Sequence, residues 1–181
     1  MDSHASITRI RGVGVPATLL AQPAQFGGTL HGDLHCGTLL VVGDRVAGME
    51  VDTALERPNR IVVPGLVEAH VHLDKCHSVE RCTVVGGDLE AAIAAQLRDK
   101  ALWTEEDLRR RAGRGLSELV AAGCRVVRTH VDWATAPGYP SQPLAWDVLG
   151  DLATGLAGQG VTLQRAALTG IDEMADAARA E

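Results

Sequence analysis

The sequence has few aromatic side chains, 3% of its 181 residues, whereas apolar residues as a whole make up 46%. A core with so few rings has to be built from aliphatic side chains packed between helices and strands, which favours an α/β fold class. Charged residues make up 22%, so the composition is that of a folded chain and differs from the highly charged, weakly hydrophobic composition of disordered segments.

The net charge is −6, with 17 lysine and arginine residues against 23 aspartate and glutamate residues. Affinity for nucleic acid rests largely on cationic contacts with phosphates, so no nucleic-acid partner is expected. No apolar run comes near the roughly 18 residues of a membrane span, and the first residues lack the apolar stretch of a signal peptide. We therefore expect no membrane partner and a cytoplasmic location. The four cysteines include no CxxC pair, which favours free thiols.

Residues 1–58 are predicted to form a small β-subdomain. The stretch from Ile7 to Val15 alternates imperfectly, and two apolar runs between Thr38 and Val51 flank Gly43-Asp44, which indicates a hairpin. The Gly-rich segment QPAQFGGTLHGDLHCG between these parts is predicted to be a loop with one short strand.

Residues 59–181 are predicted to alternate strands and helices, in the order strand, two helices, strand, helix, strand. The strands are expected in IVVPGLVEAHVHLD, CRVVRTHVDW and VTLQRAAL, and the last helix from Leu144 to Leu156 after a Pro-rich loop. This order is typical of parallel βαβ units. Three strands do not close a (β/α)8 barrel of about 250 residues, so a barrel would be incomplete. The ending GIDEMADAARAE has the pattern of a further helix, and we expect the chain to be truncated there.

The first two helices have recognisable starts. Asp88 is expected to cap a helix with an apolar stripe at Leu89, Ile93, Leu97 and Ala101. Thr104 and Asp107 form a variant of the capping box, followed by a stripe of Leu108, Ala112, Leu116, Leu119 and Val120 that Gly123 can end.

His70 and His72 form an HxH pair at the end of a predicted strand. Side chains two residues apart on a strand point to the same face, so both imidazoles are expected side by side. Two neutral imidazoles can bind one divalent cation, although an isolated HxH pair is also compatible with two polar residues on a strand face.

The surrounding sequence narrows these alternatives. The stretch VVPGLVEAHVHLDK, from Val62 to Lys75, resembles the signature of the amidohydrolase superfamily, in which a strand ends in an HxH pair after a Pro-Gly entry. Its His-Leu-Asp-Lys ending and the later RTHVD, from Arg128 to Asp132, resemble the cytosine-deaminase-like family, whose members also act on other amino-substituted pyrimidines and triazines.

The resemblance implies an incomplete metal-dependent-hydrolase (β/α)8 (TIM) barrel preceded by a small β-subdomain. It further implies one divalent metal ion, iron or zinc, and hydrolytic deamination of an amino-substituted pyrimidine or related heterocycle. His70 and His72 match the first two metal ligands of the family. The remaining ligands and the acid/base residues are expected beyond Glu181, so the isolated chain is expected to be inactive.

Five further residues are candidates for substrate contact or for supporting the metal ligands: Asp74, Lys75, His130, Asp132 and Gln164. His130 and Asp132 would share a strand face, where they either line the pocket or pack. Asp74 and Lys75 either orient a ligand or form a structural ion pair. Gln164 either contacts the substrate or faces the barrel wall, because Thr169 and Gly170 stand near the place where the family has its substrate-binding glutamine.

Two alternatives stay open. The chain could be a non-catalytic, truncated or split-gene fragment that needs a partner, either a second copy in a homo-oligomer or a missing C-terminal half, because unpaired strand edges favour association. It could also belong to an amidohydrolase that cleaves N-alkylamino groups or cyclic amides instead of an exocyclic amine. The expected substrate in every enzymatic case is a small molecule.

Overall fold

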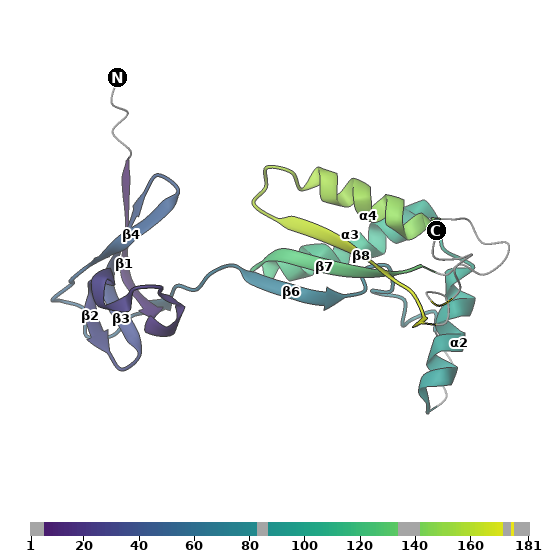
Figure 1. The fold of residues 1–181 in the computed structure, drawn as a ribbon, viewed down its shortest axis with the longest axis horizontal. Coiled ribbons are helices and arrows are strands. Elements are labelled where there is room, and N and C mark those ends of the chain that lie inside the picture. Colours follow the sequence, from purple (N-terminus) through teal and green to yellow (C-terminus); the bar gives the residue numbers. More distant parts are fainter. Residues whose placement is uncertain (1–5, 83–86, 134–141, 172–174, 176–181) are drawn as a thin grey trace, which may run out of the picture. The chain divides into compact units, whose positions relative to one another are not determined.

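The computed structural model describes residues 6–82, 87–133, 142–171 and 175, and the chain divides into two units, Met1–Pro64 and Gly65–Glu181 (Figure 1). The division proposed from the sequence, 1–58 and 59–181, differs by the segment 59–64. The physical reason is β5 (Arg60–Ile61), which pairs in parallel with β1 (Ile7–Pro16) and so joins the first unit.

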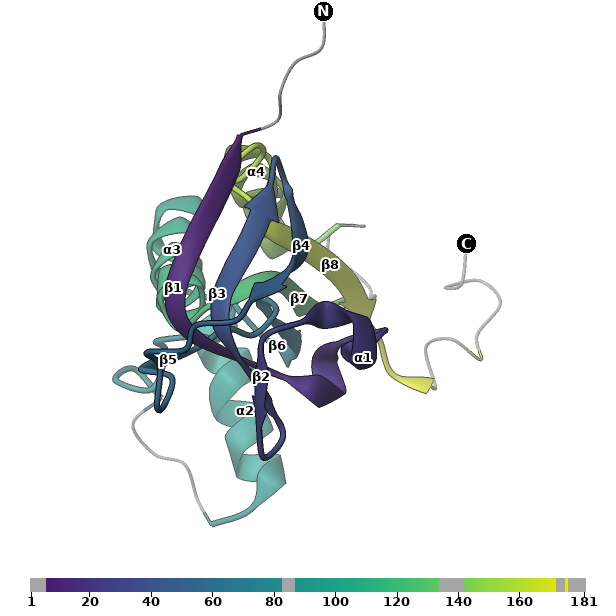
Figure 2. The same cartoon turned by 90° about the vertical axis from the view of Figure 1, so that its left-hand side faces the viewer.

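The first unit is a small β-sheet with strand order β2-β3-β1-β5, in which β4 also pairs with β3. Its other strands are β2 (Thr29–His31), β3 (Leu34–Val42) and β4 (Arg45–Glu50), and Figure 2 shows β1, β3 and β4 side by side. The predicted hairpin is confirmed, because Val42 lies opposite Arg45 across an antiparallel turn and Gly43 has a positive φ of 62°.

The Gly-rich segment before this hairpin is more ordered than the sequence suggests. It contains the short helix α1 (Pro23–Phe26), strand β2 and the start of β3, and a 3-10 turn, η1 (Ala17–Leu19), precedes it. The ring of His35 is tied to the backbone carbonyl of Gly27 at 2.8 Å, which explains part of this order. The core of this unit is Val13, Val15, Leu39 and Met49.

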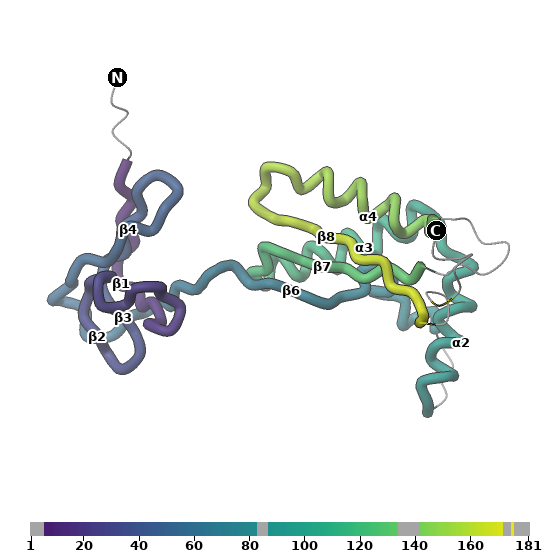
Figure 3. Tube along the Cα trace, in the orientation of Figure 1, coloured from purple at the N-terminus to yellow at the C-terminus, as the bar shows by residue number. Residues whose placement is uncertain are grey.

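The second unit is a three-stranded parallel sheet of order β6-β7-β8. Its elements in chain order are β6 (Leu66–Val71), α2 (Leu89–Lys100), α3 (Glu105–Ala121), β7 (Cys124–Asp132), α4 (Leu144–Gly155) and β8 (Thr162–Leu168). The tube trace in Figure 3 follows this path from β6 to β8. The predicted order of strands and helices in an α/β fold is therefore confirmed. The Pro-rich loop after Trp133 and the helix expected near the C-terminus lie largely outside the described residues.

Helices α3 and α4 cover one face of this sheet (Figure 1). Along β7 the burial alternates: Val127, Thr129 and Val131 are buried on the helix side, whereas His130 and Asp132 alternate with them. The core between sheet and helices consists of Leu73, Leu108, Ala112, Leu116, Cys124, Val127, Val131, Ala145, Val148, Leu149 and Leu163. His130 and Asp132 therefore lie on the face that these helices leave uncovered. None of the described helices is long and apolar enough to cross a membrane.

Both predicted helix starts are confirmed. The carboxylate of Asp88 accepts a hydrogen bond from the Ala91 amide at 2.8 Å, and the Thr104 hydroxyl accepts one from the Asp107 amide at 3.2 Å. Gly123, with φ of 100°, follows the end of α3 as expected.

The apolar stripe of α2 does not face a core in the described part of the chain. Leu89, Ile93 and Leu97 are exposed, and the buried residues of this helix are Ala95 and Asp99. Asp99 is drawn inward because Arg81 and the indole nitrogen of Trp103 both bind its carboxylate. Helical spacing thus predicted the helix but assigned the wrong side to the core.

Two glycines of α3 offer a matched test of helix packing. A Cβ at Gly113 would meet nothing within 4 Å, whereas a Cβ at Gly115 would lie 3.3 Å from Cys76 and from Leu73. We expect Gly113→Ala to raise the free energy of unfolding by about 0.5–1 kcal/mol, because alanine is the better helix former. Crowding should cancel this gain in Gly115→Ala. Denaturant unfolding checks the order, and an equal gain in both variants would contradict the close contact at Gly115.

Candidate metal centre at the carboxyl ends of the strands

Three imidazoles gather at the carboxyl ends of β6 and β7. The rings of His70 and His72 lie 5.3 Å apart between centroids, so the HxH pair does present both rings together. His130, from β7, stacks on His70 at 4.0 Å with an angle of 18° between the rings, and lies 6.0 Å from His72. The parallel pairing of β6 with β7 brings these residues together, although His72 and His130 are 58 residues apart in the sequence.

The geometry of these rings limits which of them can bind one ion. The lone pairs of an imidazole lie in the ring plane, so the nearly parallel rings of His70 and His130 cannot converge on one metal ion in this arrangement. Among the described residues, no three His, Cys, Asp or Glu side chains are arranged to hold a metal ion. The Nδ1 atoms of His72 and His130 are buried without a hydrogen-bond partner in the described chain. The donor set fits part of a divalent-metal site, since a protein zinc site takes three or four protein ligands.

The surroundings favour neutral rings at two of these positions. Burial, followed by the positive charge of Lys75, lowers the pKa of His72 below its usual value. Burial, together with the neighbouring His70, also lowers the pKa of His130. A neutral imidazole is the form that binds a metal ion.

Asp74 is fully buried two residues after His72. Neither of its carboxylate oxygens has a hydrogen-bond partner from another described residue. Burial raises the pKa of Asp74 to about 6, against the opposing charges of Lys75 and Lys100. Burying a carboxyl group without a hydrogen-bond partner costs free energy and needs an explanation. A polar or ionic contact to a group bound beside the histidines would provide one.

Lys75 and Asp132 form an ion pair at the same end of the sheet. The Lys75 ammonium lies 2.8 Å from the Asp132 carboxylate, and Lys100 of α2 lies 3.2 Å from it. Burial opposes ionisation of Asp132, but the hydrogen bond from Lys75 and the charge of Lys100 outweigh it, so the pKa of Asp132 is lowered. The sequence suggested roles for Lys75 and Asp132 separately, and Lys100 was not anticipated.

Gln164 lies away from the histidines along the strand direction. Its side-chain oxygen accepts a hydrogen bond from Arg128 Nε at 3.0 Å, and the Arg128–Gln164 pair lies two residues before the His130–Ala166 pair along the two strands. Of the five supporting candidates, the structure thus brings His130 onto the HxH pair and joins Lys75 to Asp132. Asp74 is next to them in the chain, and Gln164 is engaged elsewhere.

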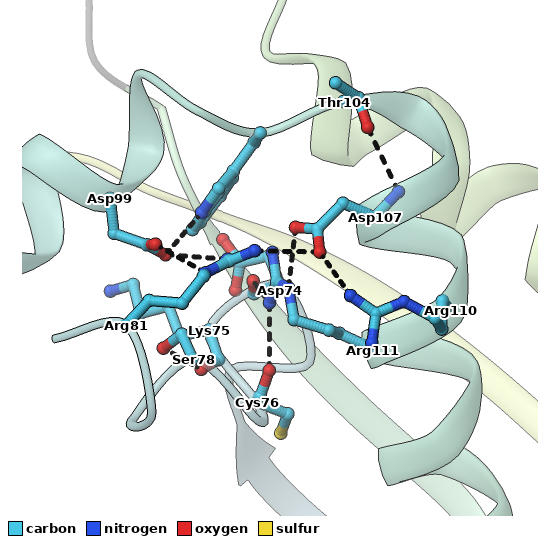
Figure 4. A network of polar contacts seen from close by, with 11 residues as sticks. Asp74, Lys75, Cys76, Ser78, Arg81, Asp99, Thr104, Asp107, Arg110 and Arg111 are labelled. Carbon is cyan, nitrogen blue, oxygen red and sulfur yellow. Dashed lines mark hydrogen bonds and ion pairs between the residues drawn. The ribbon is translucent and has the colours of Figure 1, made fainter.

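A polar network behind the HxH segment was missed by the sequence reasoning (Figure 4). It consists of Arg81, Asp99, Trp103, Asp107 and Arg111, whose side chains are joined by hydrogen bonds and ion pairs. Two pairs in it are local, Asp107–Arg111 and Asp99–Trp103, each four residues apart, and the first spacing suits an ion pair on a helix. Arg81, which joins the two pairs, is 18 residues from Asp99 and 26 from Asp107.

Comparison with known proteins adds to this geometry. No family model matches the chain. A pterin deaminase of Rhizobium rhizogenes is 30% identical over 117 residues, which is 64% of this chain and 26% of that protein. The chain therefore spans about a quarter of the length of this curated relative.

Several solved structures share the fold. N-isopropylammelide isopropylaminohydrolase from Burkholderia multivorans is 25% identical with a TM-score of 0.54, over 90% of this chain and 37% of that one. The 5-methylcytosine deaminase from Klebsiella pneumoniae is 24% identical with a TM-score of 0.54, over 88% of this chain and 36% of that one. Atrazine chlorohydrolase from Arthrobacter aurescens, solved with zinc, shares the fold at 17% identity, with a TM-score of 0.52, over 88% of this chain and 35% of that one.

These neighbours are TIM-barrel enzymes, so the parallel strands of the second unit are an incomplete part of such a barrel. The helices α3 and α4 correspond to the outer layer of a barrel, and the face with the histidines corresponds to its interior. In its fold, in its match to the pterin deaminase and in the motif around His70 and His72, the chain is therefore similar to the deaminases and hydrolases of the amidohydrolase superfamily, its cytosine-deaminase-like members included.

Proposed function

We propose that the chain supplies His70 and His72 as the first two ligands of a metal-dependent hydrolase that acts on non-peptide C–N bonds. The observation that carries the proposal is the pair of imidazole rings at the carboxyl end of β6, 5.3 Å apart. The carboxyl ends of barrel strands are where TIM-barrel enzymes place their active sites. The deaminase relatives favour hydrolytic deamination of an amino-substituted pyrimidine or a related heterocycle.

The residues of this chain would prepare the site for a divalent ion, zinc or iron. When bound, such an ion supplies Lewis acidity and an activated water for hydrolysis. The depressed pKa of His72 keeps its ring neutral near pH 7, ready to bind. The stacked ring of His130 restricts the rotation of His70. Zinc is favoured as the first ion to test, because one of the fold's neighbours holds it.

The other polar groups at this end of the sheet are proposed to face a small-molecule substrate. Asp132 is held in place by Lys75 and Lys100, so its carboxylate is a fixed acceptor near the histidines. Asp74, which is buried, would orient the metal ligands or contact the substrate. Gln164 is proposed to stay on the barrel wall, because Arg128 already binds its oxygen.

Removal of an N-alkylamino group is the second candidate reaction. The observation that favours it is the 25% identity with N-isopropylammelide isopropylaminohydrolase over 90% of this chain. The released product separates the two reactions, because deamination releases ammonia and the alternative releases an alkylamine.

Turnover by residues 1–181 alone is not expected, because the described residues offer two ligands where a catalytic site needs three protein ligands or more. The remaining ligands would come from residues beyond Glu181, from a second polypeptide or from a second copy. The proposal is therefore compatible with a fragment that has no activity of its own. We also propose a cytoplasmic location.

The proposal is tested by titrating the purified chain with Zn²⁺ in competition with a chromophoric chelator. We expect one ion per chain and an affinity that falls tenfold or more in the His70→Ala/His72→Ala double variant, since two first ligands are lost. His31→Ala, which removes an exposed imidazole of the first unit, is the matched control and should bind as the wild type does. Equal binding by the double variant would refute the assignment of the two ligands.

A further inference from the structure

Arg111 of α3 is buried, which is rare for an arginine. Its side chain is 1% exposed. Its Nη1 donates hydrogen bonds to the backbone carbonyl of Asp74 at 2.6 Å and to that of Cys76 at 2.9 Å (Figure 4). One guanidinium therefore binds two carbonyl groups of the segment that directly follows His72.

The charge of this guanidinium is offset locally. Its Nε donates to the Asp107 carboxylate at 2.8 Å, and its plane lies 5.0 Å from the centre of the Trp103 ring. A buried cation needs such a partner, because an unpaired charge in the protein interior is costly. The planar fork of arginine then holds Nη1 in a fixed direction, toward the backbone of Asp74 and Cys76, whereas Nη2 has no hydrogen-bond partner among the described residues.

The segment that Arg111 binds is a single turn built on His72. The carbonyl of His72 accepts hydrogen bonds from the amides of Lys75 at 3.0 Å and of Cys76 at 3.2 Å. The amide of Leu73 donates to the buried hydroxyl of Thr129 at 3.1 Å. The turn is thus held by β7 at its start and by α3 at its end.

Close packing adds to this hold. Gly115 lies four residues after Arg111, on the same side of α3, and a Cβ there would lie 3.3 Å from Cys76 and Leu73. The absence of a side chain at this position lets the turn approach the helix closely enough for the hydrogen bonds to Arg111.

We infer that Arg111 is a positioning residue for His72: it fixes the turn from His72 to Cys76 against α3 and so sets the direction of the imidazole. The inference rests on the proposed function insofar as His72 is a metal ligand. Groups that orient a ligand without touching the ion commonly change metal affinity by about ten- to a hundredfold when they are removed.

The test compares Arg111→Met and Arg111→Lys with the control Arg114→Met, whose parent side chain is exposed and pairs only with Glu118 among the described residues. Zn²⁺ affinity is measured at a temperature where circular dichroism shows every variant folded. We expect the affinity to fall on the order of tenfold in Arg111→Met and to stay within twofold in Arg114→Met. Lysine keeps the charge but not the planar fork, so Arg111→Lys should recover thermal stability more fully than affinity.

A second readout follows the turn without any metal. The amides of Lys75 and Cys76, which bind the His72 carbonyl, should exchange with deuterium about tenfold faster in Arg111→Met than in the wild type. An affinity loss no larger than in Arg114→Met, with unchanged exchange at these two amides, would overturn the inference. A purely structural role would lower stability and leave the affinity of the folded variant unchanged.

The two readouts separate this inference from the proposed function. If the wild-type chain binds no Zn²⁺, or binds it equally without His70 and His72, the proposed function fails. The hold of Arg111 on the turn is then decided by exchange at Lys75 and Cys76 alone, and faster exchange in Arg111→Met supports it while unchanged exchange overturns it.

Discussion

Replacement of Asp107 by asparagine is expected to lower the free energy of unfolding by about 2–3 kcal/mol at neutral pH. The Asp107 carboxylate accepts hydrogen bonds from Arg81, Arg110 and Arg111, each at 2.8 Å. Asparagine has nearly the same size but no charge, so the buried guanidinium of Arg111 would lose its counterion. The expected loss of unfolding free energy is at the lower end of the range for breaking a buried ion pair, because Arg81 keeps Asp99 as a partner.

The effect should depend on pH in a definite direction. Burial opposes ionisation of Asp107, but hydrogen bonds from Arg81 and Arg111 outweigh it and lower the pKa of its carboxyl from 3.8 to about 2. A lowered pKa in the folded state stabilises the fold fully above pH 4, and this contribution is lost as the pH falls through about 2. A shift of this size corresponds to about 2 kcal/mol. The difference between wild type and Asp107→Asn should therefore shrink toward pH 2.

Denaturant unfolding followed by tryptophan fluorescence checks this expectation, since all three tryptophans, Trp103, Trp133 and Trp146, lie in the second unit. The matched control is Asp151→Asn, because Asp151 is exposed and pairs with Arg109 at 2.7 Å. An exposed pair contributes about 0–1 kcal/mol, so the control should change little. Equal losses in the two variants, or a difference independent of pH, would refute the role given to Asp107.

The arrangement of the strands and the histidine pair could be predicted because both depend on local periodicity. Alternation along β7 separates Val127, Thr129 and Val131 from His130 and Asp132, and this follows from the period of two in any strand. The parallel order of β6, β7 and β8 follows from the helices between them. The gathering of His70, His72 and His130 is a consequence of these two regularities.

The network around Arg111 could not be predicted because its partners are set by tertiary contacts. Arg111 binds carbonyl groups 37 and 35 residues earlier in the chain, and Arg81 reaches Asp99 18 residues later. Backbone carbonyls carry no side-chain signal in a sequence. The same contacts decide that α2 buries Asp99 and exposes Leu97, which helical spacing alone assigns the other way round.

Replacement of Leu108 by alanine is expected to lower the free energy of unfolding by about 3–4 kcal/mol. Leu108 is 1% exposed and belongs to the core between α3, α4 and the sheet, together with Leu73 and Val127. Truncation removes apolar surface from this core and leaves a cavity, because the surrounding helices and strands relax only in part. The loss should exceed that of Asp107→Asn at every pH.

The control for this cavity is Leu102→Ala, which removes the same atoms from a side chain that is 67% exposed. It should change the free energy of unfolding by no more than about 0.5 kcal/mol. Leu73 directly follows His72 and shares the core with Leu108, so the cavity should also loosen the turn that carries the metal ligand. Zn²⁺ affinity of folded Leu108→Ala is therefore expected to fall below that of Leu102→Ala. A stability loss in Leu108→Ala without any loss of affinity would mean that the turn is held by Arg111 and Thr129 independently of the core beneath it.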